Sequence, residues 1–67
     1  MTYLLNGETR TAPTPLTVLE LLRRSELLQR RVAVAINAEV VPKSRFADVE
    51  IREGDRVEVI QAVGGGA

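Results

Sequence analysis

The chain has 67 residues, of which nine are basic and nine acidic, and it contains neither cysteine nor histidine. This length allows one domain with a modest core. The composition excludes disulfides, the common zinc sites and Ser-His-Asp or Cys-His catalysis, and zero net charge argues against nucleic-acid binding. No apolar run approaches the roughly 20 residues of a membrane span, and no signal peptide is recognisable, so we expect a cytoplasmic protein without a membrane partner.

The first half of the chain predicts a hairpin and then a helix. Residues 1–5 and 8–11 read as strands, because Asn6-Gly7 between them is a strong type I′ turn signal. Thr17 and Glu20 form a capping box, which predicts a helix from Val18 to about Ser25 or Glu26. Leu27 and Leu28 should then close the bottom of the core.

The second half predicts three further extended segments. Residues 32–36 alternate large apolar residues with alanine, and residues 39–41 return after Asn37-Ala38. Alanine tolerates positive φ less well than glycine, so this turn should be strained or of another type. Residues 43–48 should form a loop or 3₁₀ turn in which Phe46 covers a core edge. Brief extended structure is expected at 49–51 and the last strand at 56–62.

Four or five strands and one helix predict an α+β fold, with a mixed four- to five-stranded sheet and the helix packed across one face. The other face should be open to solvent, because one helix covers only one face. We expect a single domain over residues 1–63 and a flexible glycine-rich tail over 64–67, since glycine runs at chain ends seldom pack.

The open face offers a predicted partner-docking surface. If the larger residues of each strand point to the helix, small and apolar residues point away from it, and grouped exposed apolar residues tend to mark interfaces. The predicted docking surface consists of Leu4, Ala33, Ala35, Ile60, Ala62 and Val63.

No catalytic or metal-binding set is apparent, so we predict a protein that is not an enzyme. Its carboxylates lie at a cap, in turns or on charged faces, where they stay solvated. The glycine tail suggests another use, because a segment without Cβ atoms can enter a narrow channel and deliver its terminal carboxylate to another protein. Once activated as a mixed anhydride with AMP, that carboxylate can accept sulfur or an amine.

Four segments stand out, namely Leu5-Asn6-Gly7-Glu8, residues 31–42, Gly54-Asp55-Arg56-Val57-Glu58 and the terminal glycines. Together they resemble the sulfur carrier proteins of thiamine biosynthesis, the ThiS family, over essentially the whole chain. The resemblance implies the ubiquitin-like β-grasp fold, with the first and last strands parallel at the centre of the sheet.

The resemblance also implies a mechanism and partners. An E1-like, ThiF-like adenylyltransferase would use ATP to adenylate the C-terminus, and a sulfur donor such as a cysteine desulfurase would convert it to a thiocarboxylate for a ThiG-like thiazole synthase. No cofactor would be bound. Gly65 and Gly66 match the family's terminal pair, with Gly64 in support. Ala67 departs from the pattern and would be removed, and Ala38 stands where glycine is common.

Three other interpretations remain open at this stage. The small subunit of molybdopterin synthase shares the fold and the Gly-Gly end but tends to be longer. A ubiquitin-like modifier would be joined to lysines through the same glycine. A detached β-grasp interaction domain would carry a tail without function, and deletion of Gly65 and Gly66 would then leave its function intact.

Overall fold

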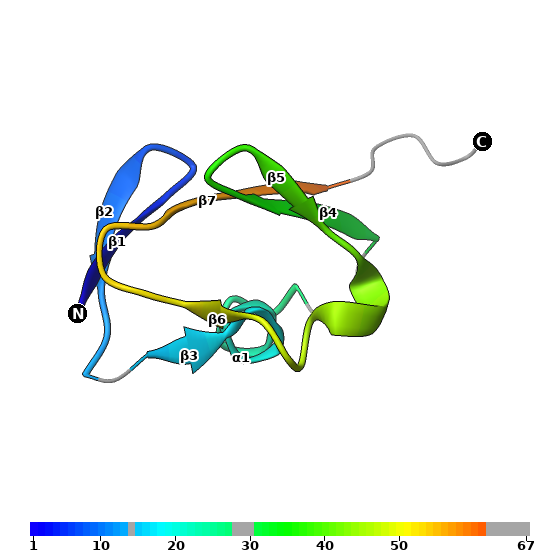
Figure 1. The fold of residues 1–67 in the computed structure, drawn as a ribbon, viewed down its shortest axis with the longest axis horizontal. Helices are drawn as coiled ribbons and strands as arrows, with labels where there is room; N and C mark the ends of the chain where they lie inside the picture. The colour runs from blue at the N-terminus through cyan, green and yellow to red at the C-terminus, as the bar shows by residue number, and fades with distance from the viewer. Residues whose placement is uncertain (14, 28–30, 62–67) are drawn as a thin grey trace.

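A five-stranded sheet, one α-helix and a small second sheet make up the fold (Figure 1). The computed structural model describes residues 1–13, 15–27 and 31–61. The elements are β1 (Thr2–Leu5), β2 (Glu8–Thr11), β3 (Leu16–Thr17), α1 (Val18–Arg24), β4 (Val32–Ile36), β5 (Glu39–Val41), the 3₁₀ helix η1 (Lys43–Arg45), β6 (Glu50–Ile51) and β7 (Arg56–Gln61).

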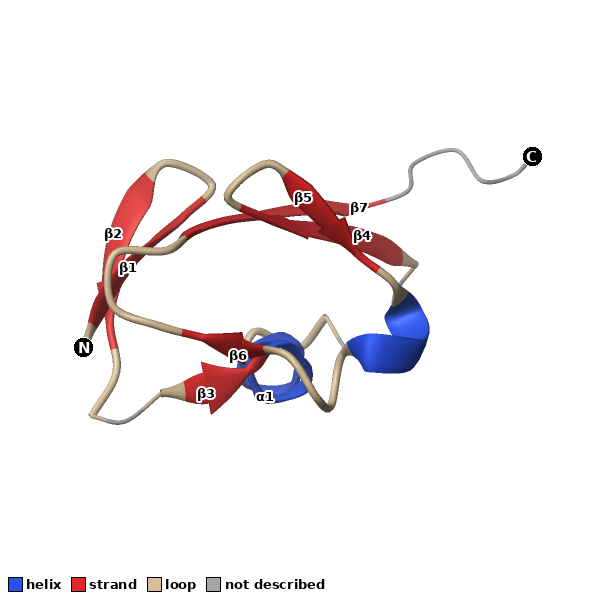
Figure 2. Ribbon diagram, viewed as in Figure 1, coloured by secondary structure: helices blue, strands red, loops and turns tan. Residues whose placement is uncertain are grey.

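The large sheet has the strand order β2-β1-β7-β4-β5. Its central strand, β7, runs parallel to β1 and antiparallel to β4, and the remaining pairs are antiparallel. The prediction of a mixed sheet with the first and last strands parallel at its centre is therefore confirmed. Figure 2 shows the helix on one side of this sheet only.

Both hairpins of the sheet turn through two residues with positive φ. Asn6 and Gly7 have φ of 51° and 85°, and Asn37 and Ala38 have φ of 51° and 70°. Positive φ at both central residues is the type I′ geometry, which suits the twist of the flanking strands. Ala38 thus adopts a left-handed conformation that costs a residue with a Cβ about 1–2 kcal/mol, and the strained form of the predicted turn is the one observed.

The helix begins at its predicted capping box. The Thr17 hydroxyl accepts a hydrogen bond from the Glu20 amide at 3.1 Å, and the Glu20 carboxylate accepts one from the Thr17 amide at 2.9 Å. Ser25 is the C-cap, and Glu26 follows with φ of 61°. The helix therefore ends at the start of the predicted boundary. Among the described residues, no helix has the length and apolar character of a membrane span.

A second, two-stranded sheet was not predicted from the sequence. Leu16 pairs with Ile51 and Thr17 with Glu50, so the entry to the helix is tied to the late part of the chain. The Val18 amide donates to the Val49 carbonyl at 3.0 Å, which continues this link. In Figure 1, β3, β6 and α1 lie together opposite the large sheet, and the core lies between the two layers.

The core contains the residues that the alternation pattern places inside. Val34 and Val57 of the sheet are each 1% exposed, and Leu22 of the helix is equally buried. Phe46 is buried as predicted, and Leu27 packs against the core from its edge. Leu28 lies outside the described residues, so its predicted place in the core stays a prediction. The inner face of the central strands is thus covered by the core, and the face open to partners is the outer one.

Candidate functional site on the outer face of the sheet

Strand β7 connects the core to the segment that leads to the glycines. Val57 points inward and Val59 is partly buried against the core, whereas Arg56, Glu58 and Ile60 are exposed. Because side chains alternate along a strand, those three residues lie on the outer face. The central strand therefore presents one apolar and two charged side chains on the face that the helix leaves open.

Four residues on this face form an outer apolar patch, namely Ala33, Ala35, Val40 and Ile60. Ala33 lies opposite Ile60 in the register of β4 and β7, and Ala35 lies opposite Val40 in the register of β4 and β5. Val40 and Ile60 are 75% and 65% exposed, and they are the large hydrophobic residues exposed in the described part of the chain. Three of the predicted docking residues are thus brought together.

Val40 is the residue of this patch that the sequence interpretation missed. A two-residue turn at Asn37-Ala38 forces Ile36 opposite Glu39 and therefore Ala35 opposite Val40. Once the turn length was predicted, the same count could have placed Val40 beside the alanines. With Val40, the patch has two large exposed apolar side chains, Val40 and Ile60, in place of one.

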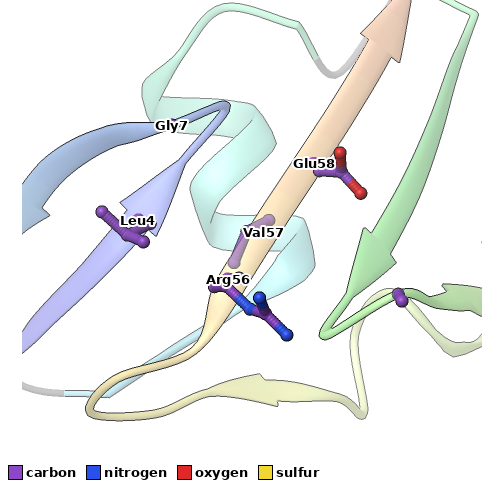
Figure 3. A pocket seen from close by; sticks show the side chains of 6 residues that line it. Leu4, Gly7, Arg56, Val57 and Glu58 are labelled. Atoms are coloured by element: carbon purple, nitrogen blue, oxygen red, sulfur yellow. The ribbon is translucent and has the colours of Figure 1, made fainter.

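Leu4 lies apart from the outer apolar patch. Its register partner on β7 is Arg56, and Glu58 of β7 is the register partner of Ala35, so these two charged residues lie between Leu4 and the alanines. Figure 3 shows Leu4 on β1 beside Arg56 and Glu58 on β7. Leu4 is half-buried at a hollow of about 290 Å³ between the tips of the two hairpins. This hollow is lined by Leu4, Gly7, Ala38, Arg56, Val57 and Glu58. The predicted surface therefore has an apolar part and a charged part.

The apolar patch carries basic side chains at the end where β7 ends. A hollow of about 400 Å³ is lined by Arg31, Val32, Ala33, Lys43 and Ile60. The ion pairs found among the described residues are Arg10–Glu8, Arg45–Asp48 and Arg52–Glu50, so neither Arg31 nor Lys43 is paired within that part of the chain. A partner that covers Ile60 would meet two positive charges there.

The remaining predicted site residues lie outside the described residues. They are Ala62 and Val63 of the predicted docking surface, and Gly64, Gly65, Gly66 and Ala67 of the predicted tail. The domain boundary at residue 63 and the carrier role of the glycines therefore stay predictions. Within the described part of the chain, no group of three acidic residues is placed to hold a metal ion.

Comparison with known proteins decides the family. The model of the ThiS family matches residues 3–66, which includes the three glycines and leaves out Ala67. The chain belongs to the ThiS family.

Similar known proteins agree with this assignment. The sulfur carrier protein ThiS of Escherichia coli is 32% identical over 66 residues, which cover 98% of this chain and all of that protein. A thiazole synthase of Paramagnetospirillum magneticum is 40% identical over all 67 residues, and the chain spans 21% of its length. A crystal structure of ThiS from Geobacter metallireducens superposes with a TM-score of 0.84 at 33% identity, over 98% of this chain and 100% of that one.

These findings confirm three of the predictions made from the sequence. The chain is a member of a family of sulfur carrier proteins of thiamine biosynthesis, its fold is the β-grasp of the solved ThiS structures, and it is a carrier rather than an enzyme. The resemblance on which these predictions depended was carried by turns, strand patterns and the terminal glycines. The turns and strand patterns are the features that the described structure places around β7.

Proposed function

We propose that this ThiS family protein carries sulfur as a thiocarboxylate on its C-terminal glycine. The terminal carboxylate attacks the α-phosphorus of ATP in an E1-like, ThiF-like enzyme, and pyrophosphate leaves. A sulfur donor, such as a cysteine desulfurase, then forms an acyl–sulfur bond as the bond to AMP breaks. If the donor is a persulfide, a thiol reduces the resulting acyl disulfide and leaves the thiocarboxylate.

The extent of the family match is the observation that supports this proposal most. It continues through Gly64, Gly65 and Gly66 and stops before Ala67. A match confined to the β-grasp body would be expected of a detached interaction domain, whereas this one includes the segment that the chemistry uses. We therefore propose Gly66 as the residue that is activated, after removal of Ala67, with Gly65 and Gly64 forming the rest of a tail over 64–67.

The proposed docking surface is the outer apolar patch with its basic end, extended by Ala62 and Val63. Apolar side chains on an otherwise charged face favour burial against a partner. We assign Leu4 to the neighbouring hollow at the hairpin tips, where a partner would meet Arg56 and Glu58 as well. The adenylating enzyme would use this face, because it adjoins the strand that leads to the activated glycine.

We propose a ThiG-like thiazole synthase as the protein that takes up the sulfur. The thiazole synthase of Paramagnetospirillum magneticum contains a segment similar to this entire chain. Carrier and consumer on one polypeptide have a high effective concentration, which is useful only if the two bind each other. We place the reaction in the cytoplasm, where ATP is supplied to the adenylating enzyme.

Mass spectrometry tests the proposed chemistry. The chain ending at Gly66, incubated with the adenylating enzyme, ATP and a sulfur donor, should gain the mass difference between sulfur and oxygen, and thiazole synthase with its substrates should remove it. The chain that retains Ala67 is the matched control and should stay unchanged. Lysine-linked conjugates in place of the sulfur-bearing form would favour the protein modifier, and no change with an active enzyme would contradict the carrier.

A further inference from the structure

Strand β7 is longer than its parallel partner. β1 pairs with it only at Leu4 opposite Arg56 and Leu5 opposite Val57, and then the chain turns away at Asn6-Gly7. The last backbone bond of this ladder runs from the Asn6 amide to the Val57 carbonyl at 2.9 Å. Beyond it, the next residue of β7 with backbone groups facing β1 is Val59, since these groups alternate between the two neighbours of a strand.

The side chain of Asn6 takes the place of the missing strand. Its Oδ1 accepts a hydrogen bond from the Val59 amide at 2.9 Å, and its Nδ2 donates to the Val59 carbonyl at 3.2 Å. In a parallel ladder these two bonds would come from the backbone of residues two apart on the partner strand. One carboxamide, which holds a donor and an acceptor, supplies both.

Asn37 occupies the equivalent position in the second hairpin but holds the opposite end of β7. Its Oδ1 accepts from the Arg56 amide at 3.0 Å, and its Nδ2 donates to the Asp55 carboxylate at 3.1 Å. Both asparagines have φ of 51° and are exposed. They differ in the part of β7 to which they bind. Asn37 forms its hydrogen bonds at the start of the strand, and Asn6 forms them at Val59, next to Ile60 and Gln61.

We propose that Asn6 is a positioning residue for the reaction at the C-terminus, an inference that rests on the proposed function. Gly66 is the seventh residue after Val59, and seven extended residues drawn out in a partner's channel would reach about 24 Å. At that length, a swing of about 10° at Val59 moves the terminal carboxylate by about 4 Å. An error of about 1 Å is enough to slow a reaction strongly.

β4 holds the last part of β7 on one side, through the pairs Ala33–Ile60 and Val32–Gln61. On the other side, the Asn6 carboxamide forms the hydrogen bonds to the Val59 backbone that are found within the described residues. Loss of these two hydrogen bonds frees one edge of β7 two residues before Gln61, the last residue that the structure describes. The docked face can then remain in place while fewer of the docked complexes hold the carboxylate at ATP.

The test compares Asn6→Gly with Asn37→Gly in the chain ending at Gly66. Glycine keeps both turns possible, because it accepts positive φ, and each variant loses the two hydrogen bonds of one carboxamide. Measured quantities are the unfolding midpoint, the hydrogen exchange rate of the Val59 amide, and kcat and KM for adenylation. We expect similar midpoints for the two variants, and about tenfold faster exchange at Val59 in Asn6→Gly alone.

For adenylation we expect kcat of Asn6→Gly to fall about five- to tenfold, with KM within about twofold of the unchanged chain. Asn37→Gly should keep both constants. Equal kcat in Asn6→Gly and the unchanged chain overturns the proposal, and so does an equal fall in both variants, which would mean general loosening. If the unchanged chain itself is not adenylated, the proposed function fails. The proposal on Asn6 fails in a different way, because the unchanged chain is then adenylated and only the effect of the substitution is missing.

Discussion

At the scale of single residues, the two hairpin turns are a natural experiment on positive φ. They share the type I′ geometry and an asparagine in first position, but Gly7 is replaced by Ala38 in the second turn. A Cβ at Gly7 would meet nothing within 4 Å, so the difference between the turns is one of backbone energy and not of space. Ala38 is accordingly a site where the fold holds avoidable strain.

We predict that Ala38→Gly stabilises the protein. Relief of the left-handed alanine exceeds the extra entropy that glycine adds to the unfolded chain, and the expected net gain is about 1 kcal/mol in the free energy of unfolding. Urea denaturation followed by circular dichroism measures it. The mirror substitution Gly7→Ala should lower stability by about 1 kcal/mol, because the same two effects act with opposite sign. A loss of stability in Ala38→Gly would show that the turn is not strained.

At the scale of elements, the short pair β3–β6 contributes more than its length suggests. Ile51 is fully buried and belongs to the core, and its strand joins the start of the helix to the crossing that follows η1. A domain of this size has few such residues with which to exclude water. The second sheet therefore closes the core on the side that the large sheet leaves open.

We predict that Ile51→Ala lowers the free energy of unfolding by about 2–5 kcal/mol, because it removes fully buried methyl groups and leaves a cavity. The midpoint of thermal or urea unfolding measures this loss. Val40→Ala is the matched control, since its side chain is 75% exposed, and it should change stability by less than about 0.5 kcal/mol. Equal effects of the two substitutions would place β6 outside the cooperative core.

At the scale of the whole molecule, the two faces of the sheet differ in their surroundings. The core covers the inner face of the central strands, and the outer face carries the apolar patch around Ile60, with Arg31 and Lys43 lining the hollow beside it. Because Ile60 belongs to the central strand, a partner seated on it lies next to Gln61, the last residue that the structure describes before the glycines of the sequence. If this face binds the adenylating enzyme as proposed, stability and binding depend on alternate residues of one strand.

We predict that Ile60→Glu weakens binding to the adenylating enzyme about tenfold or more, because it buries a charge in an apolar interface. Stability should change by less than about 0.5 kcal/mol, since the side chain is exposed. Titration calorimetry measures the affinity. Thr11→Glu adds the same charge to the exposed edge strand β2 and should bind normally. Unchanged affinity of Ile60→Glu would exclude this face as the docking surface.

Several features of the fold were predictable because they depend on neighbours in the sequence. The capping box at Thr17, the Asn6-Gly7 turn and the alternation in residues 32–36 each contain their own physical reason within a few residues. The same holds for the exposure of Ala33 and Ile60. The pairing of Leu16 with Ile51 was not predictable in this way, since it joins two-residue segments that have no pattern of their own.

The sequence by itself determined the helix, the strands of the large sheet and which of their residues point inward or outward, because turn chemistry and side-chain periodicity act locally. Only the tertiary structure decided that Arg56 separates Leu4 from the apolar patch, that Val40 joins it, and that Asn6 reaches Val59 across 53 positions. These relations depend on strand order and on where each strand ends beside its neighbour. Both depend on the packing and hydrogen bonding of all the strands together, so no local pattern in the sequence predicts them.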